Sequence, residues 1–466
     1  MEFRSVLSYL GTVLEAAGIL AIIPVFVAWA YGESTHTLFF ITAVISFILG
    51  LLLDRKFKKK ELNMSSAMVL ASLGLVVVSL IGSIPFLWDI GPLDAAFESF
   101  SGFTTTGMTA VKPESLPYSL VFWRALTQWA GGLGVLVIFI FLVRSPGISS
   151  YYGRRPELDE GRQRSLIRRV AGIYGLLTVF GIILLMLTGI GLFDSLSTGL
   201  SAICTGGFSA KDSSIAAYHS IWVEGIVMLL MIVGATSFLL IEGLTRGNLL
   251  DYLKCAESRL FWGLAVSFTI LLSFAMFGIE EPVRHGLFQS VSALTTGGFT
   301  TLQSAPSGLA MLLLIVLMVI GGFGASTAGG LKLSRAGIMA KAFPWIGKKV
   351  TLPQEAIVPL KYDGRVVKDS EVTIVAVFTA IYVLFLFGSA ILLSFMGYQP
   401  LESLYQAASA QGNVGLSVIP LDSMNPLGKL ILMAGMVLGR LEIFPVLGLL
   451  YMLVKTRLGR KDIISG

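Results

Sequence analysis

The sequence predicts an all-α polytopic membrane protein with about ten transmembrane helices and four re-entrant pore helices. Of its 466 residues, 55% are apolar and only 13% are charged, and a water-soluble protein with this balance would expose apolar patches large enough to cause precipitation. Apolar runs of about 20 residues, the length that crosses a hydrocarbon core, recur along the chain. Between these runs, a short stretch centred on a glycine recurs four times, at Gly107, Gly207, Gly298 and Gly415.

Ten apolar runs are long enough to span a membrane. In chain order they lie near residues 5–30, 36–53, 66–88, 119–143, 167–190, 221–243, 260–279, 309–342 (interrupted), 372–396 and 427–454. Four shorter apolar segments, at 94–104, 194–204, 285–295 and 402–411, each lie between two spans. They are too short to cross a membrane, so they are predicted to be re-entrant half-helices. The polar residues at their starts are suited to capping them: Asp94, Asp194, His285 and Glu402.

The four glycine stretches align residue for residue. A serine stands six positions before each glycine, and a serine or threonine stands two positions after it; the columns are Ser101, Ser201, Ser292 and Ser409, and Thr109, Ser209, Thr300 and Ser417. The repeats are about 90 to 120 residues apart, too long for a solenoid unit but long enough for one hairpin of membrane helices. We therefore predict a helix pair at 1–64 and four pore repeats, at 65–165, 166–258, 259–370 and 371–466, in a pseudo-fourfold arrangement.

The net charge of +6 reflects basic residues that are concentrated in particular loops. They are Arg55, Lys56, Lys58, Lys59 and Lys60, then Arg154, Arg155, Arg162, Arg164, Arg168 and Arg169, and then Lys348, Lys349, Lys361 and Arg365. These loops fall on one side of the predicted bundle, and basic loops mark the cytoplasmic side. The distribution predicts a multi-pass protein of the cell membrane whose glycine loops face outside, and it does not indicate a nucleic-acid-binding face.

Glycine at the same point of four loops suits a cation filter. A chain that turns successive carbonyl groups toward a pore often needs backbone angles that only glycine adopts without steric cost, and potassium filters are lined in this way. Half-helices that end at the loops would also direct the negative ends of their dipoles toward a cation. The predicted filter residues are Thr105, Thr106, Gly107, Thr205, Gly206, Gly207, Thr296, Gly297, Gly298, Asn413, Val414 and Gly415. The alternative is that small residues only allow close helix packing.

Several motifs resemble those of the Trk/Ktr/HKT superfamily of potassium transporters, most closely its TrkH-type potassium uptake subunits. They are Ser101-Gly102-Phe103-Thr104-Thr105-Thr106-Gly107, Phe122-Trp123-Arg124, Thr127-Gln128-Trp129, Gly131-Gly132-Leu133-Gly134, Thr295-Thr296-Gly297-Gly298-Phe299 and Gly439-Arg440-Leu441-Glu442-Ile443-Phe444. The first helix pair also resembles the extra N-terminal pair of that type. In this family a serine in the first filter loop accompanies sodium preference. The matching residue here is Gly107, so the resemblance favours potassium. The fourth loop is the loosest match, because Asn413 replaces threonine.

A glycine-rich break interrupts the eighth predicted span, where each glycine would cost a helix about 1 kcal/mol relative to alanine. The resemblance implies that this segment is an intramembrane gating loop, formed by residues that include Gly321, Gly322, Gly324, Ser326, Thr327, Gly329 and Gly330. Arg440 lies within the last span, where a charge costs about 2.5 to 3.5 kcal/mol to insert. The resemblance places Arg440 beside the gating loop, where it would oppose a resting cation; Glu442 is a possible partner. Close packing of the break and a structural ion pair are the alternatives.

No catalytic constellation or metal-ligand cluster is evident in the sequence, so an intramembrane enzyme is only a remote alternative. The nearer alternatives are sodium or mixed sodium and potassium transport, and ion-coupled symport. We expect potassium as the transported ion and no cofactor in this chain. The resemblance implies a homodimer in the lipid bilayer, controlled by a cytosolic regulatory subunit of the TrkA type that carries the nucleotide.

Overall fold

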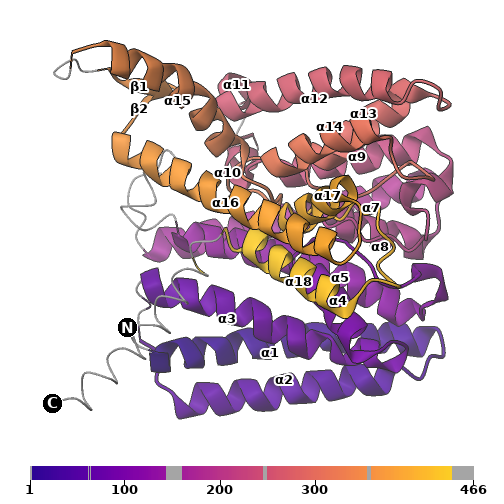
Figure 1. Cartoon of the computed structure of the whole chain (residues 1–466). Coiled ribbons are helices and arrows are strands. Elements are labelled where there is room, and N and C mark those ends of the chain that lie inside the picture. Colours follow the sequence, from indigo (N-terminus) through magenta and orange to yellow (C-terminus); the bar gives the residue numbers. More distant parts are fainter. Residues whose placement is uncertain are drawn as a thin grey trace.

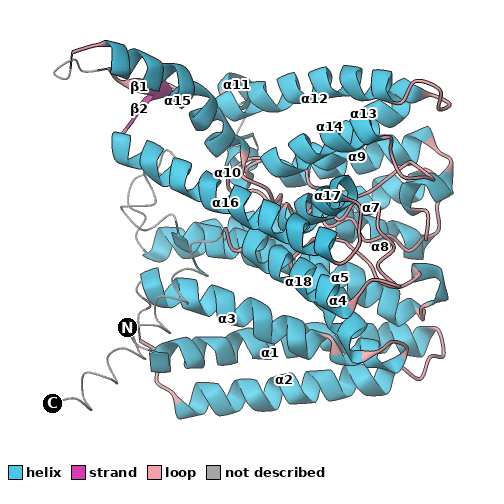
Figure 2. Cartoon of the chain, in the orientation of Figure 1, coloured by secondary structure: helices cyan, strands magenta, loops and turns pink. Residues whose placement is uncertain are grey.

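The computed structural model describes residues 3–60, 62, 64–142, 160–244, 249–353, 358–442 and 445. Long helices lie side by side, with α1 and α2 at one edge of the bundle and α12 at the opposite edge (Figure 1). Loop segments enter the middle of the bundle near α8 and α17 (Figure 2). Large apolar side chains cover much of the outer surface, including Leu187, Phe274 and Phe395, which are 78%, 74% and 85% exposed. Such a surface suits contact with lipid and not with water.

The N-terminal pair consists of α1 (Phe3–Ala30) and α2 (His36–Lys56). These helices approach closely because small residues face each other across the seam. A Cβ atom added to Gly11 would lie 2.6 Å from the Gly50 carbonyl oxygen, and one added to Gly50 would lie 2.8 Å from the Gly11 oxygen. Neither helix can therefore carry a side chain at this crossing.

The rest of the chain forms the four predicted helix–pore helix–helix units. They comprise α3 (Met64–Gly82), α4 (Pro92–Phe103) and α5 (Tyr118–Leu142); α7 (Glu160–Leu187), α8 (Leu192–Ile203) and α9 (Ile221–Ala235) with α10 (Phe238–Leu244); α12 (Ala256–Ala275), α13 (Pro282–Leu294) and α14 (Gly308–Ile320); and α16 (Asp369–Phe395), α17 (Pro400–Gln411) and α18 (Pro426–Arg440). Short helices η1 (Ile84–Trp88) and η2 (Pro113–Ser115) lie within the first unit, η3 (Ser214–Tyr218) lies within the second, and α11 (Leu249–Lys254) lies between the second and the third. The four pore helices are thus confirmed as short segments.

Within the described residues, seven helices are long and apolar enough to cross a membrane, or eight if the bent pair α9 and α10 counts as one span. The remaining predicted spans are the interrupted eighth, which begins with the shorter α14, and the last, of which α18 is the described part. Predicted residues beyond Glu442, among them Ile443 and Phe444, lie outside the described residues except for the single position 445.

The sixth predicted span is not continuous, which corrects the prediction of one helix over 221–243. Its two parts, α9 and α10, are bent by 104°. The reason is a competing set of hydrogen bonds with the glycine-rich segment of the eighth span. The Ala235 oxygen accepts a bond from the Phe323 amide at 3.1 Å, and the Phe238 amide donates to the Ala325 oxygen at 3.1 Å. Groups that would continue the helix ladder are therefore used elsewhere.

The predicted helix caps are also wrong. The pore helices begin after Gly91, Gly191, Glu281 and Gln399, and none of these residues makes a side-chain capping bond. Three of the helices start with proline, a residue suited to the first helical position: Pro92, Pro282 and Pro400. This earlier start moves Asp94, Asp194 and Glu402 into the first turn, where a negative charge still favours the helix dipole.

The eighth span resumes as α15 (Leu333–Thr351), which leads into a two-stranded hairpin that the sequence did not predict. Strands β1 (Leu360–Tyr362) and β2 (Arg365–Val367) pair antiparallel, with Leu360 opposite Val367 and Tyr362 opposite Arg365. The hairpin and α15 project from the bundle at the end where the N-terminus lies (Figure 1).

Candidate ion pathway

The four pore helices end in the same hydrogen-bonded cap. In the first, the Thr106 amide donates to the Ser101 oxygen at 2.9 Å and the Thr105 amide donates to the Gly102 oxygen at 2.8 Å. This pair of bonds defines a Schellman motif. The bond to the serine oxygen recurs in the other three helices. The Gly206 amide donates to the Ser201 oxygen at 2.8 Å, the Gly297 amide to the Ser292 oxygen at 2.8 Å and the Val414 amide to the Ser409 oxygen at 2.9 Å. The serine column therefore marks a fixed position before each helix end.

The residue that reverses the chain at each cap has a left-handed backbone. The φ values are 51° at Thr105, 52° at Thr205, 54° at Thr296 and 51° at Asn413. Asparagine adopts this conformation more readily than most residues with a side chain. The loosest loop in the sequence thus has the same backbone geometry as the other three at this position, and the change from threonine to asparagine has a conformational explanation.

The four aligned glycines form a closed ring. All have positive φ, at 85°, 83°, 70° and 101° in chain order. Each glycine lies against the loop of the next repeat. For example, a Cβ atom added to Gly207 would be 2.9 Å from the Gly297 oxygen. The matching neighbours are the Gly206 oxygen for Gly107, the Val414 oxygen for Gly298 and, closing the circle, the Thr106 oxygen for Gly415. The ring therefore has no space for another side chain.

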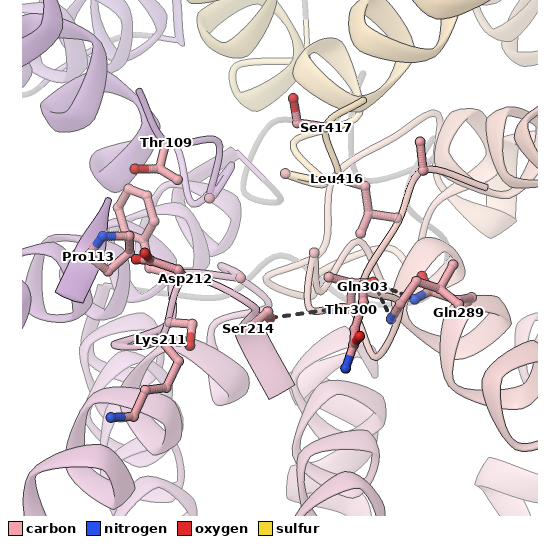
Figure 3. Close-up of a pocket in the computed structure, with 18 of the residues that line it drawn as sticks. Thr109, Pro113, Lys211, Asp212, Ser214, Gln289, Thr300, Gln303, Leu416 and Ser417 are labelled. Carbon is pink, nitrogen blue, oxygen red and sulfur yellow. Dashed lines mark hydrogen bonds between the residues drawn. The ribbon is translucent and has the colours of Figure 1, made fainter. Parts of the chain in front are cut away.

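All four glycines line one cavity of about 260 Å³. Figure 3 shows Thr109, Ser214, Thr300 and Ser417, one from each repeat, around this cavity, with the hydrogen bond of 3.3 Å from the Thr300 amide to Ser214 Oγ. A common cavity beside a glycine ring gives a small ion access to all four loops at once. The pseudo-fourfold arrangement is thus visible in the loops themselves.

In three loops, a long polar side chain of the pore helix braces the stretch that directly follows the glycine, which we call the outgoing strand of the loop. The sequence reasoning missed this feature. Gln289 Nε2 donates to Thr300 Oγ1 at 2.6 Å, and Gln406 Nε2 donates to Ser417 Oγ at 3.0 Å. In the first loop, the Thr109 hydroxyl donates to Glu98 at 2.8 Å. These braces all stand nine positions before the glycine, where the second repeat has Thr198. That fixed offset was available in the sequence.

Glu98 also forms a fully buried ion pair with Arg124. Arg124 Nε lies 2.9 Å from Glu98 Oε2, and the two side chains are 1% and 0% exposed. Glu98 further accepts the Ala110 amide at 2.7 Å, while the Arg124 guanidinium donates to the Ser209 oxygen at 3.3 Å. The pair therefore connects the first loop to the second.

Replacing Arg124 with methionine should lower the free energy of unfolding by about 3 to 5 kcal/mol, because it leaves a buried carboxylate without its partner. Thermal unfolding of the purified protein in detergent would measure the loss. The double variant Glu98→Gln with Arg124→Met removes both charges and should recover part of the stability. A double variant less stable than Arg124→Met alone would contradict this account.

The predicted gating segment lies against the loop ring and is buried except at the half-buried Gly324. The Gly329 amide donates to Thr296 Oγ1 at 2.8 Å, and Thr327 Oγ1 lies 3.2 Å from Thr205 Oγ1. The two ends of the segment touch, since a Cβ atom added to Gly330 would be 2.8 Å from the Gly321 Cα. Both glycines have positive φ, of 72° and 76°.

The other predicted gate residues have separate neighbours. A Cβ atom added to Gly322 would be 2.6 Å from the Ala328 side chain, and one added to Gly324 would be 3.4 Å from Glu257 Oε1. Ser326 Oγ donates to the Phe323 oxygen at 2.6 Å within the segment. These contacts hold the segment as one compact turn.

Arg440 reaches this segment from α18. It is 5% exposed, and Nη1 donates to the Thr327 oxygen at 2.7 Å while Nη2 donates to the Gly131 oxygen at 3.4 Å. The guanidinium thus binds main-chain carbonyl groups. The partner considered for it in the sequence, Glu442, forms an ion pair with Arg335. A second buried cation, Lys332, donates to the Ala328 oxygen of the same segment.

A bundle of apolar helices whose four re-entrant loops close into one ring defines a membrane transport protein. Comparison with known sequences gives the family: the chain belongs to the TrkH family of cation transport proteins, whose sequence model matches residues 35–455. It is 31% identical over 461 residues to an uncharacterized cation transporter of Methanocaldococcus jannaschii, with 96% of this chain and 95% of that protein aligned.

Two further relatives are named as potassium transport proteins. The Trk system potassium uptake protein TrkH of Escherichia coli K12 is 30% identical over 475 residues, covering 96% of this chain and 98% of that protein. The crystal structure of the potassium transporter TrkH from Vibrio parahaemolyticus superimposes with a TM-score of 0.87 at 28% identity, covering 97% of this chain and 99% of the other. The chain is therefore a member of a transporter family and not of an enzyme family.

Proposed function

We propose that this protein takes up potassium across the cell membrane through a selectivity filter formed by its four re-entrant loops. The observation that carries the proposal is the ring of Gly107, Gly207, Gly298 and Gly415, each with positive φ and each against the carbonyl oxygen of the next loop. A ring of backbone oxygens can replace the hydration shell of potassium. The names of the bacterial TrkH relatives support the choice of ion.

The filter consists of the loop residues predicted from the sequence, with the left-handed residue and the glycine setting the backbone of each loop. The four pore helices direct their C-terminal ends toward the ring, where their dipoles favour a cation. Asn413 Nδ2 donates to Thr106 Oγ1 at 3.0 Å and to the Met436 oxygen at 2.9 Å, and its Oδ1 faces α18, 2.9 Å from a Cβ atom added to Gly439. This arrangement leaves the backbone as the main source of ligands.

The segment Gly321–Gly330 is the gate, and Arg440 holds it closed. Support comes from the hydrogen bonds that join Thr327 to Arg440 on one side and Gly329 to the filter residue Thr296 on the other. The segment closes the path beside the ring, and the buried guanidinium adds a positive charge that repels a resting cation. Opening requires these hydrogen bonds to break.

Transport needs no cofactor in this chain, because an inside-negative potential contributes about 2.3 kcal/mol per charge for each 100 mV. We place the basic loops in the cytoplasm and the filter loops outside. Two chains form a homodimer in the membrane, and a cytosolic subunit of the TrkA type binds the regulatory nucleotide and controls the gate. The multi-component system implied by the names of the relatives supports this assembly.

Uptake of a rubidium tracer into liposomes that contain the purified protein tests the function. We expect potassium, but not sodium, to compete with the tracer, and we expect uptake to follow an imposed inside-negative potential. Equal competition by sodium would favour the mixed-ion alternative, and uptake that requires a second ion gradient would favour symport. Absence of uptake even with a TrkA-type subunit and nucleotides would overturn the proposal. Empty liposomes are the control.

A further inference from the structure

The second loop is the one that its own pore helix does not brace. In the other repeats a long polar side chain nine positions before the glycine bonds to the outgoing strand. Thr198 holds this position in the second repeat, and within the described residues no hydrogen bond joins its short side chain to that strand. The second loop contains two consecutive glycines, Gly206 and Gly207, as does the third loop, which Gln289 braces. Glycine has the greatest backbone freedom. This loop therefore has most need of a brace.

The neighbouring helix α5 supplies one through Gln128. This side chain is 0% exposed. Its Nε2 donates to the Gly206 oxygen at 2.5 Å, and its Oε1 accepts the Phe208 amide at 3.2 Å. Both partners are main-chain groups with one possible role each, so the orientation of the amide is defined. The two bonds fall on either side of Gly207.

Arg124, one turn earlier on α5, extends the same brace. Its Nη1 donates to the Ser209 oxygen at 3.3 Å, and its guanidinium carbon lies 4.0 Å from the centre of the Phe208 ring. Two side chains of one helix thus bind three main-chain groups of the second loop: the Gly206 oxygen, the Phe208 amide and the Ser209 oxygen. This role accounts for two buried polar residues on a helix that spans the membrane.

The equivalent residue of the next repeat shows what Gln128 adds. Gly131 in α5 and Gly234 in α9 each lie against the last carbonyl of a pore helix, at Phe103 and Ile203. Gln128 and Met231 both stand three positions before these glycines. Met231 packs against Gly297 of the third loop, as Gln128 packs against Gly206 of the second. The packing is shared, and the pair of hydrogen bonds is specific to Gln128.

We propose that Gln128 is a positioning residue of the filter, which sets the orientation of the Gly206 and Gly207 peptides and thereby the discrimination between potassium and sodium. The inference rests on the proposed function, because it assumes that the ring selects ions. Gln128 acts through the backbone of the second loop. Without its two hydrogen bonds, the Gly206 carbonyl can rotate while the other three loops keep their own braces, and the ring loses uniform geometry.

Two variants in the liposome assay test the proposal. Gln128→Met copies the shape found at Met231 and removes both hydrogen bonds. We expect rubidium flux to persist and the ratio of potassium to sodium competition to fall by at least about fivefold, since one lost hydrogen bond alone is typically worth a change of that size. Gln128→Glu keeps the shape but, when ionised, loses the donor to Gly206. Its ion ratio should match wild type at low pH, where the protonated acid donates again, and should fall as pH rises.

The charged groups around this site are Arg124 with its partner Glu98 on one side and Arg440, which reaches Gly131, on the other. The matched control is Gln399→Glu, which makes the same substitution at an exposed residue directly before α17 that is not among the residues lining the cavity. The control and the wild type should show ratios without the pH response of Gln128→Glu.

A folded Gln128→Met protein with wild-type ion ratios would overturn the inference. If Gln128→Met does not fold, the pH series of Gln128→Glu decides: a pH-dependent ratio supports the inference and a constant ratio overturns it. The proposed function fails separately, when the wild-type protein itself shows no preference between potassium and sodium.

Discussion

Replacing Arg440 with alanine should raise the resting rubidium flux by about 10- to 100-fold. In the proposed gate, the 2.7 Å bond from its guanidinium to the Thr327 oxygen holds the segment Gly321–Gly330 in place. A hydrogen bond to a charged group contributes about 1.5 to 3 kcal/mol, and each 1.4 kcal/mol changes an equilibrium tenfold. Losing this bond therefore favours the open state by one to two orders of magnitude. Efflux from rubidium-loaded liposomes without the regulatory subunit measures the leak.

Two companion variants separate charge from attachment. Arg440→Lys retains the positive charge, but the ammonium group lacks the planar set of donors with which the guanidinium binds two carbonyl groups. We therefore expect an intermediate leak. Arg259→Ala removes an exposed arginine of α12 and should leave the leak unchanged. A folded Arg440→Ala protein that leaks no more than Arg259→Ala would show that the arginine does not hold the gate.

Gly107→Ser should reduce the preference for potassium over sodium by about tenfold, or about 1.4 kcal/mol. Gly107 has φ of 85°, and any added Cβ atom would collide with the Gly206 oxygen. The serine must therefore push the first and second loops apart or change the backbone of the first. Either response disturbs the spacing of the carbonyl oxygens, on which selectivity depends in the proposed filter. Sodium competition with rubidium uptake measures the change.

Gly388→Ser is the matched control for this variant. Gly388 lies in α16, and a Cβ atom added there would meet no heavy atom within 4 Å. The same substitution at this glycine should therefore leave ion competition as in wild type. Unchanged ion ratios in Gly107→Ser, with normal expression and folding, would refute the role assigned to the first loop.

The sequence predicted the pore helices because their length and apolar character are local properties. Three of these helices begin a few residues before the predicted polar caps, because Pro92, Pro282 and Pro400 suit the first helical position. The braces at Glu98, Gln289 and Gln406 were missed although they share one offset. The residue types at this offset differ more than those of the two serine and threonine columns, since the second repeat has Thr198 there.

Other features depend on contacts between distant parts of the chain. The bend between α9 and α10 arises because the Ala235 carbonyl binds Phe323, and no pattern within 221–243 indicates this contact. The position of Arg440 within the span was evident from the sequence, but its attachment to Thr327 required the fold. The pairing of Glu442 with Arg335 likewise depends on how α15 and the end of α18 meet.

The contact between the fourth loop and the first, which closes the ring, can form only late in the synthesis of the chain. Asn413 bonds to Thr106 across 307 residues of chain, and at about 5 to 20 residues per second a ribosome needs about 15 to 60 s to make that length. During this interval the first loop is in the membrane without its final neighbour. A nascent chain that stops before the fourth repeat therefore has three loops and an open side. If the ring is the filter, as we propose, selective conduction begins only after the fourth repeat has been synthesised.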